Sequence, residues 1–387
     1  MKSFAYHAPT ALYFGQNCLQ SQIDLIKSFG KKAFIITSVF SGGARNLALE
    51  DIQGLFAEHG VDSIVYSDTE ENPSVESVVK AASALRTYDP DMIFCIGGGS
   101  ALDTAKAVNV LIRYPADCDA YQVFYGNGWS LNKRSCGLLP LLGVPTTAGS
   151  GSEVMGYAVL TRNDTHTKLR MDQMSFFDAA FLDAKYIADS PQWLLDAGAM
   201  DALAHGVEGY LNTFSCAPER LWHDYGFRLF KRYKDALRSC TLEADNFERM
   251  LTAASVQGIA VMQSGTSIPH GMGYPLTHFK NVTHGLASAI MLPAYLEVFQ
   301  NRELVDHVIS ACGFENVDEF SAFIDEICSR NISIAVTDEE IEHWADQCYA
   351  LTTRLERHPE PITRDQIRDM YRKALRRYIK KEQQKIA

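Results

Sequence analysis

The N-terminal half of the chain alternates short apolar runs with amphipathic stretches. Residues 32–37 (KAFIIT), 62–66 (DSIVY) and 91–96 (DMIFCI) each have the composition of a buried strand. Between them, residues 46–59 and 74–87 place their apolar side chains with helical spacing. Short apolar strands that alternate with amphipathic helices are typical of a parallel, doubly wound sheet. The pattern therefore predicts an α/β domain at the N-terminus.

This alternation is expected to continue to about residue 185, after which helical spacing recurs in one segment after another. The segments that predict helices are 192–213, 219–239, 243–265, 285–299, 316–329, 338–353 and 364–383. We expect residues 1–187 to form the α/β domain and residues 188–387 to form an all-helical domain. A chain of 387 residues is long enough for each domain to bury a core of its own.

Composition and charge argue against several classes of binding partner. The formal net charge is -11, and no long run of Lys and Arg occurs, so a nucleic acid is not an expected partner. We see no secretory signal and no segment of 18 uninterrupted apolar residues, which argues against a membrane partner. The 9 cysteines are scattered and form no CxxC motif, as in a reducing compartment. We expect a cytoplasmic protein that acts on a small molecule.

Two loops rich in Gly, Ser and Thr follow apolar strands. Residues 95–106 (CIGGGSALDTAK) lead from a strand through a glycine turn into a helix start, where Ser100 can cap the helix and backbone N–H groups can bind phosphate. Residues 144–153 (VPTTAGSGSE) combine hydroxyl donors with glycines. The first loop alone is equally well explained as a plain tight turn. Ligands of open α/β sheets bind beyond the carboxyl ends of the strands, so the two loops together predict a dinucleotide site.

Acidic and histidine residues in the C-terminal half have metal-ligand spacing. Asp201 and His205 are four residues apart in a helical pattern and share one face. By itself, this pair is more typical of an ordinary helix with one buried histidine. Further along, His270, His278 and His284 lie close together among Gly and Pro residues, where a loop would aim side chains inward. Two of these imidazoles, with the first pair, would supply three nitrogens and one oxygen, which suits Fe²⁺ or Zn²⁺.

Together, these motifs resemble those of the iron-containing (group III) alcohol dehydrogenases, relatives of glycerol dehydrogenase and dehydroquinate synthase. The matching segments span nearly the whole chain and are YFG at 13–15, ENP at 71–73, GGGSALDTAK at 97–106, PTTAGSGSE at 145–153, FLDAKYI at 181–187, MDALAHGVEGYL at 200–211 and the histidine run 270–284. The resemblance implies a dehydroquinate synthase-like architecture, in which the N-terminal α/β domain binds the dinucleotide and the all-helical domain binds the metal. We also expect a homodimer or a higher homo-oligomer.

The resemblance also implies roles for individual residues. The positions that match the family's metal ligands are Asp201, His205, His270 and His284. The positions that match its cofactor contacts are Ser38, Asn72, Gly98, Gly99, Ser100, Asp103, Thr146, Thr147, Lys168 and Leu182. We therefore expect NAD or NADP and one divalent metal ion, which is Fe²⁺ by the resemblance, with Zn²⁺ or another ion as the alternative.

The chain departs from the family pattern in three places. Many members have an Asp where this chain has Ser38, which leaves the choice between NAD and NADP open. Several members carry a further His where this chain has Tyr274, and many have Asn-Pro-Arg where it has His358-Pro359-Glu360. We expect Tyr274 near the substrate, as a hydrogen-bond donor or as an aromatic wall. His278 is a candidate for proton transfer, and His278 or Lys280 is a candidate for binding an anionic end of a short aldehyde.

The expected reaction is a metal-assisted hydride transfer that interconverts a small primary alcohol and its aldehyde. The metal acts as a Lewis acid on the oxygen, and the nicotinamide carries the hydride. Enzymes of the same fold are the alternatives: a dehydroquinate synthase-like lyase or a glycerol dehydrogenase-like polyol dehydrogenase. A nucleotide- or metal-binding protein without catalysis is the third hypothesis. Ser38 predicts use of both NADH and NADPH, and Arg45 is the cation that could reach a 2′-phosphate.

Overall fold

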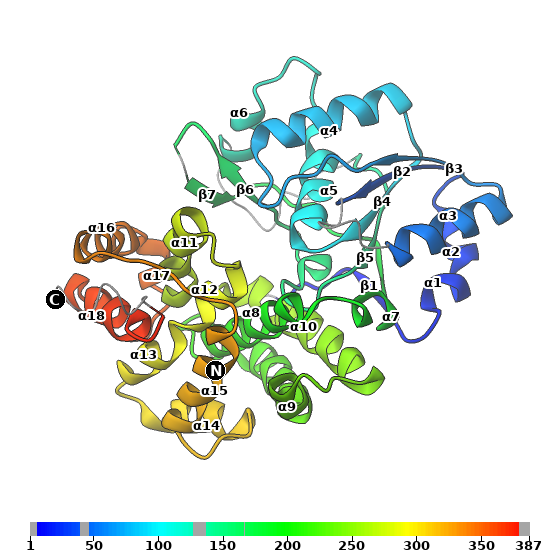
Figure 1. Cartoon of the computed structure of the whole chain (residues 1–387). Helices are drawn as coiled ribbons and strands as arrows, with labels where there is room; N and C mark the ends of the chain where they lie inside the picture. Colours follow the sequence, from blue (N-terminus) through cyan, green and yellow to red (C-terminus); the bar gives the residue numbers. More distant parts are fainter. Residues whose placement is uncertain (1–5, 39–45, 127–136, 166, 379–387) are drawn as a thin grey trace. The chain divides into compact units, whose positions relative to one another are not determined.

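Two compact units make up the chain (Figure 1). The α/β unit comprises Ala8–Thr147 and Gly151–Asp189. The helical unit comprises the chain from Ser190 onward, together with Ala148–Ser150 and the segment that ends at His7. The structure is a computed structural model, and it describes all residues except 1–5, 39–45, 127–136, 166 and 379–387.

A six-stranded parallel sheet forms the centre of the α/β unit, with the strand order β1-β8-β5-β4-β2-β3. Its strands are β1 (Ala11–Phe14), β2 (Lys32–Thr37), β3 (Asp62–Tyr66), β4 (Met92–Gly97), β5 (Leu141–Pro145) and β8 (Ala179–Leu182). The helices of this unit are α1 (Cys18–Ser21), α2 (Ile23–Ser28), α3 (Leu47–His59), α4 (Val75–Tyr88), α5 (Gly99–Leu111), α6 (Ala120–Tyr125) and α7 (Lys185–Ala188). The N-terminal parallel α/β architecture predicted from the sequence is thereby confirmed.

Helices cover both faces of this sheet (Figure 1). Successive residues of β2 point to opposite sides, so Phe34 and Ile36 pack in one apolar cluster and Ala33 and Ile35 in another. The first cluster contains the buried faces of α4 and α5, and the second contains the buried face of α3. Burial of both faces explains why the central strands β2 and β4 are continuously apolar rather than alternating. The strand at 62–66 was also expected to be buried, but β3 lies at the edge of the sheet and its Asp62, Ile64 and Val65 are exposed.

Between β5 and β8 the chain does not alternate strand and helix, so the sequence prediction was wrong for this segment. A 3₁₀ turn at Ser152–Val154 follows β5, and the chain then forms an antiparallel hairpin of β6 (Val159–Arg162) and β7 (Thr167–Arg170). This hairpin is a separate two-stranded sheet. Antiparallel strands need only a short turn between them, whereas a parallel crossover needs a dozen or more residues. The short polar connection that begins at Asn163 therefore gives a hairpin.

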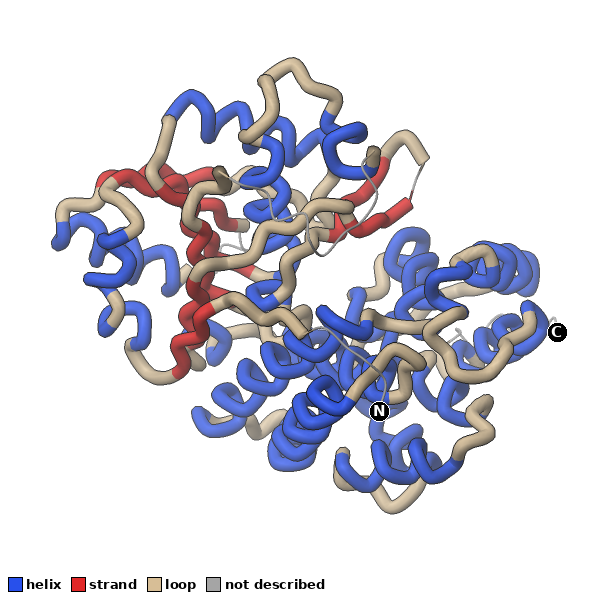
Figure 2. The backbone as a smooth tube through the Cα atoms, turned by 180° about the vertical axis from the view of Figure 1, so that it is seen from behind, coloured by secondary structure: helices blue, strands red, loops and turns tan. Residues whose placement is uncertain are grey.

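The helical unit consists of helices and loops in the part of the chain that the structure describes (Figure 2). Its helices are α8 (Gln192–Tyr210), α9 (Ala217–Ser239), α10 (Ala244–Ser264), α11 (Ile268–Lys280), α12 (His284–Ala289), α13 (Leu292–Glu297), α14 (Arg302–Ala311), α15 (Val317–Ser329), α16 (Asp338–Tyr349), α17 (Thr352–Leu355) and α18 (Arg364–Leu375). Every residue of α8 from Leu195 to Tyr210 is buried, so this helix is the core of the unit. Among the described residues, no helix has both the length and the apolar character that crossing a membrane requires.

The segment that carries His270 forms a helix, so the prediction of a loop there was wrong. Proline is well tolerated in the first turn of a helix, where Pro269 lies in α11, whereas Pro275 inside α11 costs a backbone hydrogen bond. Tertiary packing outweighs this cost. A Cβ atom at Gly273 would lie 3.1 Å from the backbone of Ala287, so this glycine permits close packing of α11 against α12. The single helix expected over 285–299 is likewise divided into α12 and α13.

Candidate metal and dinucleotide sites

Helix α8 places two of the predicted metal ligands one turn apart. Asp201 and His205 are each 7% exposed, and Nε2 of His205 lies 4.0 Å from Oδ1 of Asp201. A Cβ atom at Gly198 would lie 3.0 Å from the carbonyl oxygen of Ala148, so a loop backbone packs directly on this stretch of α8. Both side chains are therefore enclosed within the helical unit.

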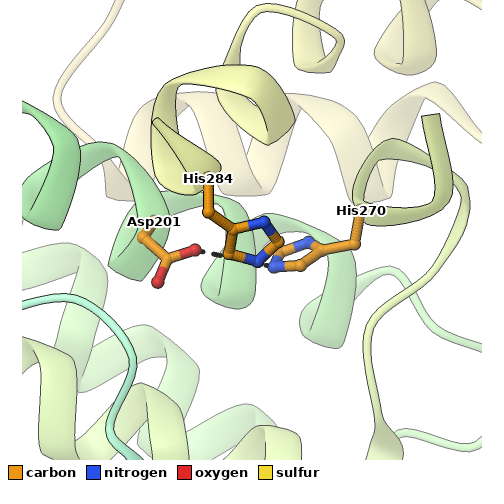
Figure 3. Close-up of side chains that lie close together, drawn as sticks. All are labelled: Asp201, His270 and His284. Atoms are coloured by element: carbon orange, nitrogen blue, oxygen red, sulfur yellow. Dashed lines mark ion pairs between the residues drawn. The ribbon is translucent and has the colours of Figure 1, made fainter. Parts of the chain in front are cut away.

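Helices α11 and α12 bring the other two predicted ligands to the same place. Nε2 of His270 lies 3.6 Å from Oδ1 of Asp201, and the rings of His270 and His284 meet edge to face with centroids 5.3 Å apart (Figure 3). One ligand atom each from Asp201, His270 and His284 lies within 4.8 Å of the others. His205 lies beside this group, with its ring stacked on His270 at a centroid distance of 4.8 Å.

Close contact between α12 and α8 determines where His284 lies. A Cβ atom at Gly285 would lie 2.1 Å from the carbonyl oxygen of Ala197 and 2.7 Å from Cβ of Asp201. Any residue larger than glycine would separate the two helices at this point. The glycine that follows His284 therefore keeps this histidine next to Asp201.

Glu208 is a buried carboxylate for which the sequence analysis predicted no role. Its Oε1 lies 2.5 Å from Nδ1 of His270, and its Oε2 accepts hydrogen bonds from the backbone N–H groups of Ser267 (2.7 Å) and His270 (3.3 Å). Because a carboxylate only accepts, Nδ1 of His270 donates to Glu208, and Nε2 is the ring nitrogen that faces Asp201. Such carboxylate–histidine pairs orient metal ligands. The spacing Asp201, His205, Glu208 along one helical face is the signal that could have identified it.

The electrostatics of this cluster favour a bound cation. Burial alone would raise the pKa of the Asp201 carboxyl, but His205 and His270 outweigh burial and hold that pKa below its usual value. Burial also acts to lower the pKa of His270, yet Glu208 and Asp201 raise it to about 10. The histidines thus lie in the field of two buried carboxylates, which stabilises positive charge.

Two buried polar atoms of the cluster test whether a metal ion fits. Among the described residues, Oδ1 of Asp201 and Nε2 of His270 have no hydrogen-bond partner. A buried polar atom without a partner is costly, and each such atom calls for an explanation. An oxygen and a nitrogen that lie 3.6 Å apart on the same side of the cluster are the donor types that Fe²⁺ and Zn²⁺ accept. The residues present therefore fit a divalent metal ion.

The remaining candidates on α11 differ in their placement. Tyr274 lies one turn beyond His270, and its ring stacks on His284 with centroids 6.1 Å apart. His278 is exposed, with its ring against Phe279. Eight residues of helix separate His278 from His270 by about 12 Å along the axis. Because the segment is a helix rather than a loop, His278 does not join the ligands, and only Tyr274 stays beside them.

In the α/β unit, the two glycine-rich loops lie side by side at the carboxyl ends of β4 and β5. The backbone N–H of Thr146 donates to the carbonyl of Gly97 (3.0 Å), and a Cβ atom at Gly98 would lie 3.0 Å from the side chain of Thr147. Helix α5 begins at Gly99, and no side chain caps its N-terminus. Ser100 does not cap the helix as expected, because it lies inside the first turn. The uncapped N-terminus can bind an anion.

Asn72, Ser100 and Lys168 form one hydrogen-bonded group next to these loops. The backbone N–H of Asn72 donates to Oγ of Ser100 (3.1 Å), and Nζ of Lys168 donates to Oδ1 of Asn72 (2.7 Å). Asn72 has a left-handed backbone with φ 56°, and Lys168 lies on the hairpin strand β7. Burial lowers the pKa of Lys168 to about 8. Three of the predicted cofactor contacts therefore lie together.

Asp103 is held by other residues of the α/β unit. Its carboxylate accepts hydrogen bonds from Oγ of Ser152 (2.6 Å) and from the backbone N–H of Val159 (2.9 Å). It also pairs with Lys106 (2.9 Å), a fully buried lysine for which the sequence analysis predicted no role. Lys106 in turn donates to Oγ of Ser152 (2.7 Å) and to the carbonyl of Tyr157 (2.6 Å). This ion pair anchors the loop that follows β5.

Ser38 and Leu182 complete the predicted cofactor set. Ser38 follows the end of β2, and its Oγ accepts a hydrogen bond from Oγ1 of Thr69 (3.0 Å). Its Oγ would lie 3.7 Å from a Cβ atom at Gly97, so Ser38 lies next to the first glycine loop. Leu182 is the last residue of β8 and is buried. Arg45 lies outside the described residues.

Comparison with known proteins identifies the family. The profile described as "Iron-containing alcohol dehydrogenase" matches residues 9–184, and the one described as "Fe-containing alcohol dehydrogenase family, C-terminal" matches residues 196–375. Lactaldehyde reductase of Escherichia coli is 30% identical over 287 residues, which are 73% of this chain and 72% of that protein. The bifunctional aldehyde-alcohol dehydrogenase of the same organism is 28% identical over 293 residues. This match covers 73% of this chain but 32% of that longer protein.

Solved structures agree with these sequence matches. The crystal structure of an iron-containing alcohol dehydrogenase from Thermotoga maritima has a TM-score of 0.85 and 30% sequence identity with this chain. The match covers 96% of this chain and 99% of that one, so it includes both units. The chain belongs to the iron-containing alcohol dehydrogenase family.

Proposed function

We propose that this chain is a metal-dependent, NAD(P)-linked oxidoreductase that interconverts a small primary alcohol and its aldehyde. The observation that carries the proposal is the cluster in which ligand atoms of Asp201, His270 and His284 lie within 4.8 Å of one another, with His205 beside them, in a chain of this family. We propose these four residues as the ligands of one divalent ion, Fe²⁺ or alternatively Zn²⁺.

Each group of residues has a distinct part in this reaction. When bound, the metal ion supplies a Lewis acid for the alcohol or aldehyde oxygen. Glu208 accepts the Nδ1 hydrogen of His270 and so keeps its Nε2 available as a ligand atom. Tyr274 offers a hydroxyl group beside His284. The N-terminus of α5 and the ammonium group of Lys168 attract the phosphates of the dinucleotide.

We further propose that the enzyme uses both NADH and NADPH. A carboxylate at the position of Ser38 would repel the 2′-phosphate of NADP by like charge. Ser38 carries no charge, and its hydroxyl group can both donate and accept a hydrogen bond. A neutral donor at the end of β2 therefore accommodates either form of the adenosine ribose.

The location and assembly of the protein are also proposals. The nine scattered cysteines without a CxxC motif support a cytoplasmic location. Strand β1 is an edge strand of the sheet, and Phe14 at its end is 45% exposed. An edge strand presents unpaired backbone groups with which another chain can pair, which supports a homodimer or a larger homo-oligomer. Sedimentation of the purified protein would measure its assembly.

A substrate panel tests the proposed activity. The protein is loaded with Fe²⁺ or Zn²⁺ without oxygen, and the oxidation of NADH and NADPH is followed with acetaldehyde, propanal, lactaldehyde and dihydroxyacetone. We expect turnover of at least one aldehyde with both cofactors, and slower turnover of the ketone. No turnover in either direction with any of these compounds would contradict the proposal and favour a binding protein. A preference for NADH above about a thousandfold, roughly 4 kcal/mol, would contradict the role given to Ser38.

A further inference from the structure

Ser267, the residue that precedes α11, is held by hydrogen bonds from two sides. Its backbone N–H donates to Oε2 of Glu208 (2.7 Å), whose other oxygen contacts the ring of His270. Its hydroxyl group accepts a hydrogen bond from Oη of Tyr295 on α13 (3.2 Å). Glu208, Ser267 and Tyr295 are fully buried, so bulk water cannot replace a lost partner. The position of Ser267 therefore affects Glu208 and, through it, His270.

The first turn of α11 is capped by Glu208 rather than by Ser267. A serine at this position usually accepts a hydrogen bond from a backbone N–H of the first turn. The side chain of Ser267 makes no such bond, and Oε2 of Glu208 accepts from the backbone N–H of His270 instead (3.3 Å). One carboxylate thus caps the helix and orients its histidine, while the hydroxyl of Ser267 contacts Tyr295. A shift of Ser267 would change the hydrogen bonds of Glu208 directly.

The hydroxyl group of Tyr295 is in turn held by His358. Nδ1 of His358 lies 3.3 Å from Oη of Tyr295, and Phe299 packs edge to face on the imidazole with ring centroids 4.4 Å apart. Burial lowers the pKa of His358 to about 4, although Glu360 acts to raise it. The ring is therefore neutral near pH 7, and it offers Tyr295 a hydrogen bond rather than a charge.

Glu360 connects this network to the loop before α14. Its Oε2 lies 3.5 Å from Nε2 of His358, and its carboxylate accepts hydrogen bonds from the backbone N–H groups of Gln300 (3.0 Å) and Asn301 (3.4 Å). His358 and Glu360 belong to one of the three segments in which the sequence departs from the family pattern. This departure therefore lies in a series of contacts that leads to a proposed metal ligand.

We propose that Tyr295 and His358 are positioning residues of the metal site, which act through Ser267 and Glu208 on the orientation of the His270 ring. The inference rests on the proposed function, because it takes His270 as a ligand of the ion. Neither Tyr295 nor His358 touches the ion, the cofactor or the substrate. A ligand ring that is already held in its binding orientation loses less freedom when the metal binds, so loosening the network weakens metal binding.

Metal affinity tests the proposal without depending on turnover. The Kd for Zn²⁺ is measured by competition with a chelating dye, and the absorption spectrum of the Co²⁺-loaded protein reports the geometry of the ligands. Tyr295→Phe removes only the hydroxyl group. We expect it to raise the Kd for Zn²⁺ about three- to tenfold, less than Glu208→Gln does, and to shift the Co²⁺ absorption bands.

His358 allows a comparison with a conservative variant. His358→Leu removes the group that contacts Tyr295 and should raise the Kd for Zn²⁺ about threefold. An asparagine side chain places an amide group near the position of Nδ1, and the network needs a hydrogen bond there rather than a charge. His358→Asn should therefore keep the Kd within about twofold of the wild-type value.

A double-mutant cycle separates this role from a loss of stability. If Tyr295 acts through Glu208, Tyr295→Phe should change the Kd less than about twofold when Glu208→Gln is already present. An independent structural effect would be as large in this background as in the wild type. If Tyr295→Phe does not fold, Ser267→Ala removes the same hydrogen bond from the other side.

Two control variants lie outside this network, and thermal unfolding is measured for every variant. Tyr233→Phe removes a buried hydroxyl group of α9, where Tyr233 packs on Phe230. Lys280, which the sequence suggested as a partner for an anionic substrate, pairs with Glu340 at the C-terminal end of α11 (2.6 Å). Lys280→Met therefore removes a contact of the same helix. Both controls should leave the Kd for Zn²⁺ and the Co²⁺ spectrum unchanged.

The outcomes distinguish this inference from the proposed function. A wild-type Kd and Co²⁺ spectrum in a folded Tyr295→Phe or Ser267→Ala protein would overturn the inference and leave the proposed ligands standing. An undiminished effect of Tyr295→Phe in the Glu208→Gln background would also overturn it, as would equal losses in His358→Asn and His358→Leu. A wild-type protein that binds neither Zn²⁺ nor Co²⁺ would refute the proposed metal site itself.

Discussion

In the helical unit, the proposed metal ligands come from three helices, α8, α11 and α12, and all are buried except His284, which is half-buried. In the α/β unit, the proposed cofactor contacts are mainly glycines, hydroxyls and backbone groups at the carboxyl ends of strands. The metal cluster depends on atoms that are distant in sequence and must meet within a few ångströms. The dinucleotide loops depend on turns whose shape is largely local.

This difference predicts different responses to mutation. The metal ligands bind the ion together, so the loss of one ligand should abolish binding of the ion. A dinucleotide bound by many backbone N–H groups loses only one of several contacts when a side chain changes. We therefore expect steep effects in the helical unit and graded effects in the α/β unit.

The largest effect is expected from removing a metal ligand. His270→Ala and His284→Ala should lose the bound ion and lower kcat/KM by roughly a thousandfold or more, because a metal ion contributes several kcal/mol to the reaction. Elemental analysis of the purified variants measures the ion directly. His343→Ala removes an exposed histidine of α16 and serves as the matched control. Full metal content in both variants would contradict the proposal that these four residues bind the ion.

A smaller effect is expected from Glu208, which contacts a ligand rather than the ion. Glu208→Gln replaces a charged acceptor with a neutral one beside Nδ1 of His270 and should weaken metal binding by about 10- to 100-fold. Competition with a chelator measures this affinity. Glu248→Gln on the exposed face of α10 is the control. Equal affinities in the two variants would show that Glu208 is only a structural acceptor for α11.

The smallest effect is expected from Lys168 and depends on pH. Burial lowers the pKa of Lys168 to about 8, so its ammonium group is charged below that pH and loses its proton above it. The attraction for the anionic dinucleotide should weaken as the pH rises through about 8. We expect the Kd of NADH to increase by about tenfold, roughly 1.4 kcal/mol, between pH 7 and pH 9.5.

The Kd can be followed by fluorescence titration. Lys168→Arg keeps a positive charge throughout this range and should flatten the profile. Folding responds with the opposite sign: because the pKa of Lys168 is lower in the folded chain than in the unfolded one, the charged form is the destabilised one. Stability should therefore rise with pH between about 8 and the unfolded value of 10.5. A pH profile of Kd that is the same in wild type and Lys168→Arg would exclude Lys168 from the dinucleotide site.

The sequence by itself determined the class of each unit and indicated the residues from which the proposed sites are built. Apolar runs at 32–37 and 91–96 correspond to β2 and β4 within a residue, because a strand buried on both faces must be apolar throughout. The run at 62–66 corresponds to the edge strand β3. The spacing of Asp201 and His205 indicated one helical face. These features are local, so the order of residues along the chain is enough to reveal them.

Only the tertiary structure decided how these pieces meet. His284 reaches Asp201 because Gly285 lets α12 approach α8, and α11 is a helix despite Pro275 because Gly273 lets it pack on α12. The spacing along α8 places Glu208 on the face of His205, but its contact with His270, 62 positions away, depends on this packing. Contacts between distant segments follow from the shapes of packed helices rather than from periodicity, so no local pattern in the sequence encodes them.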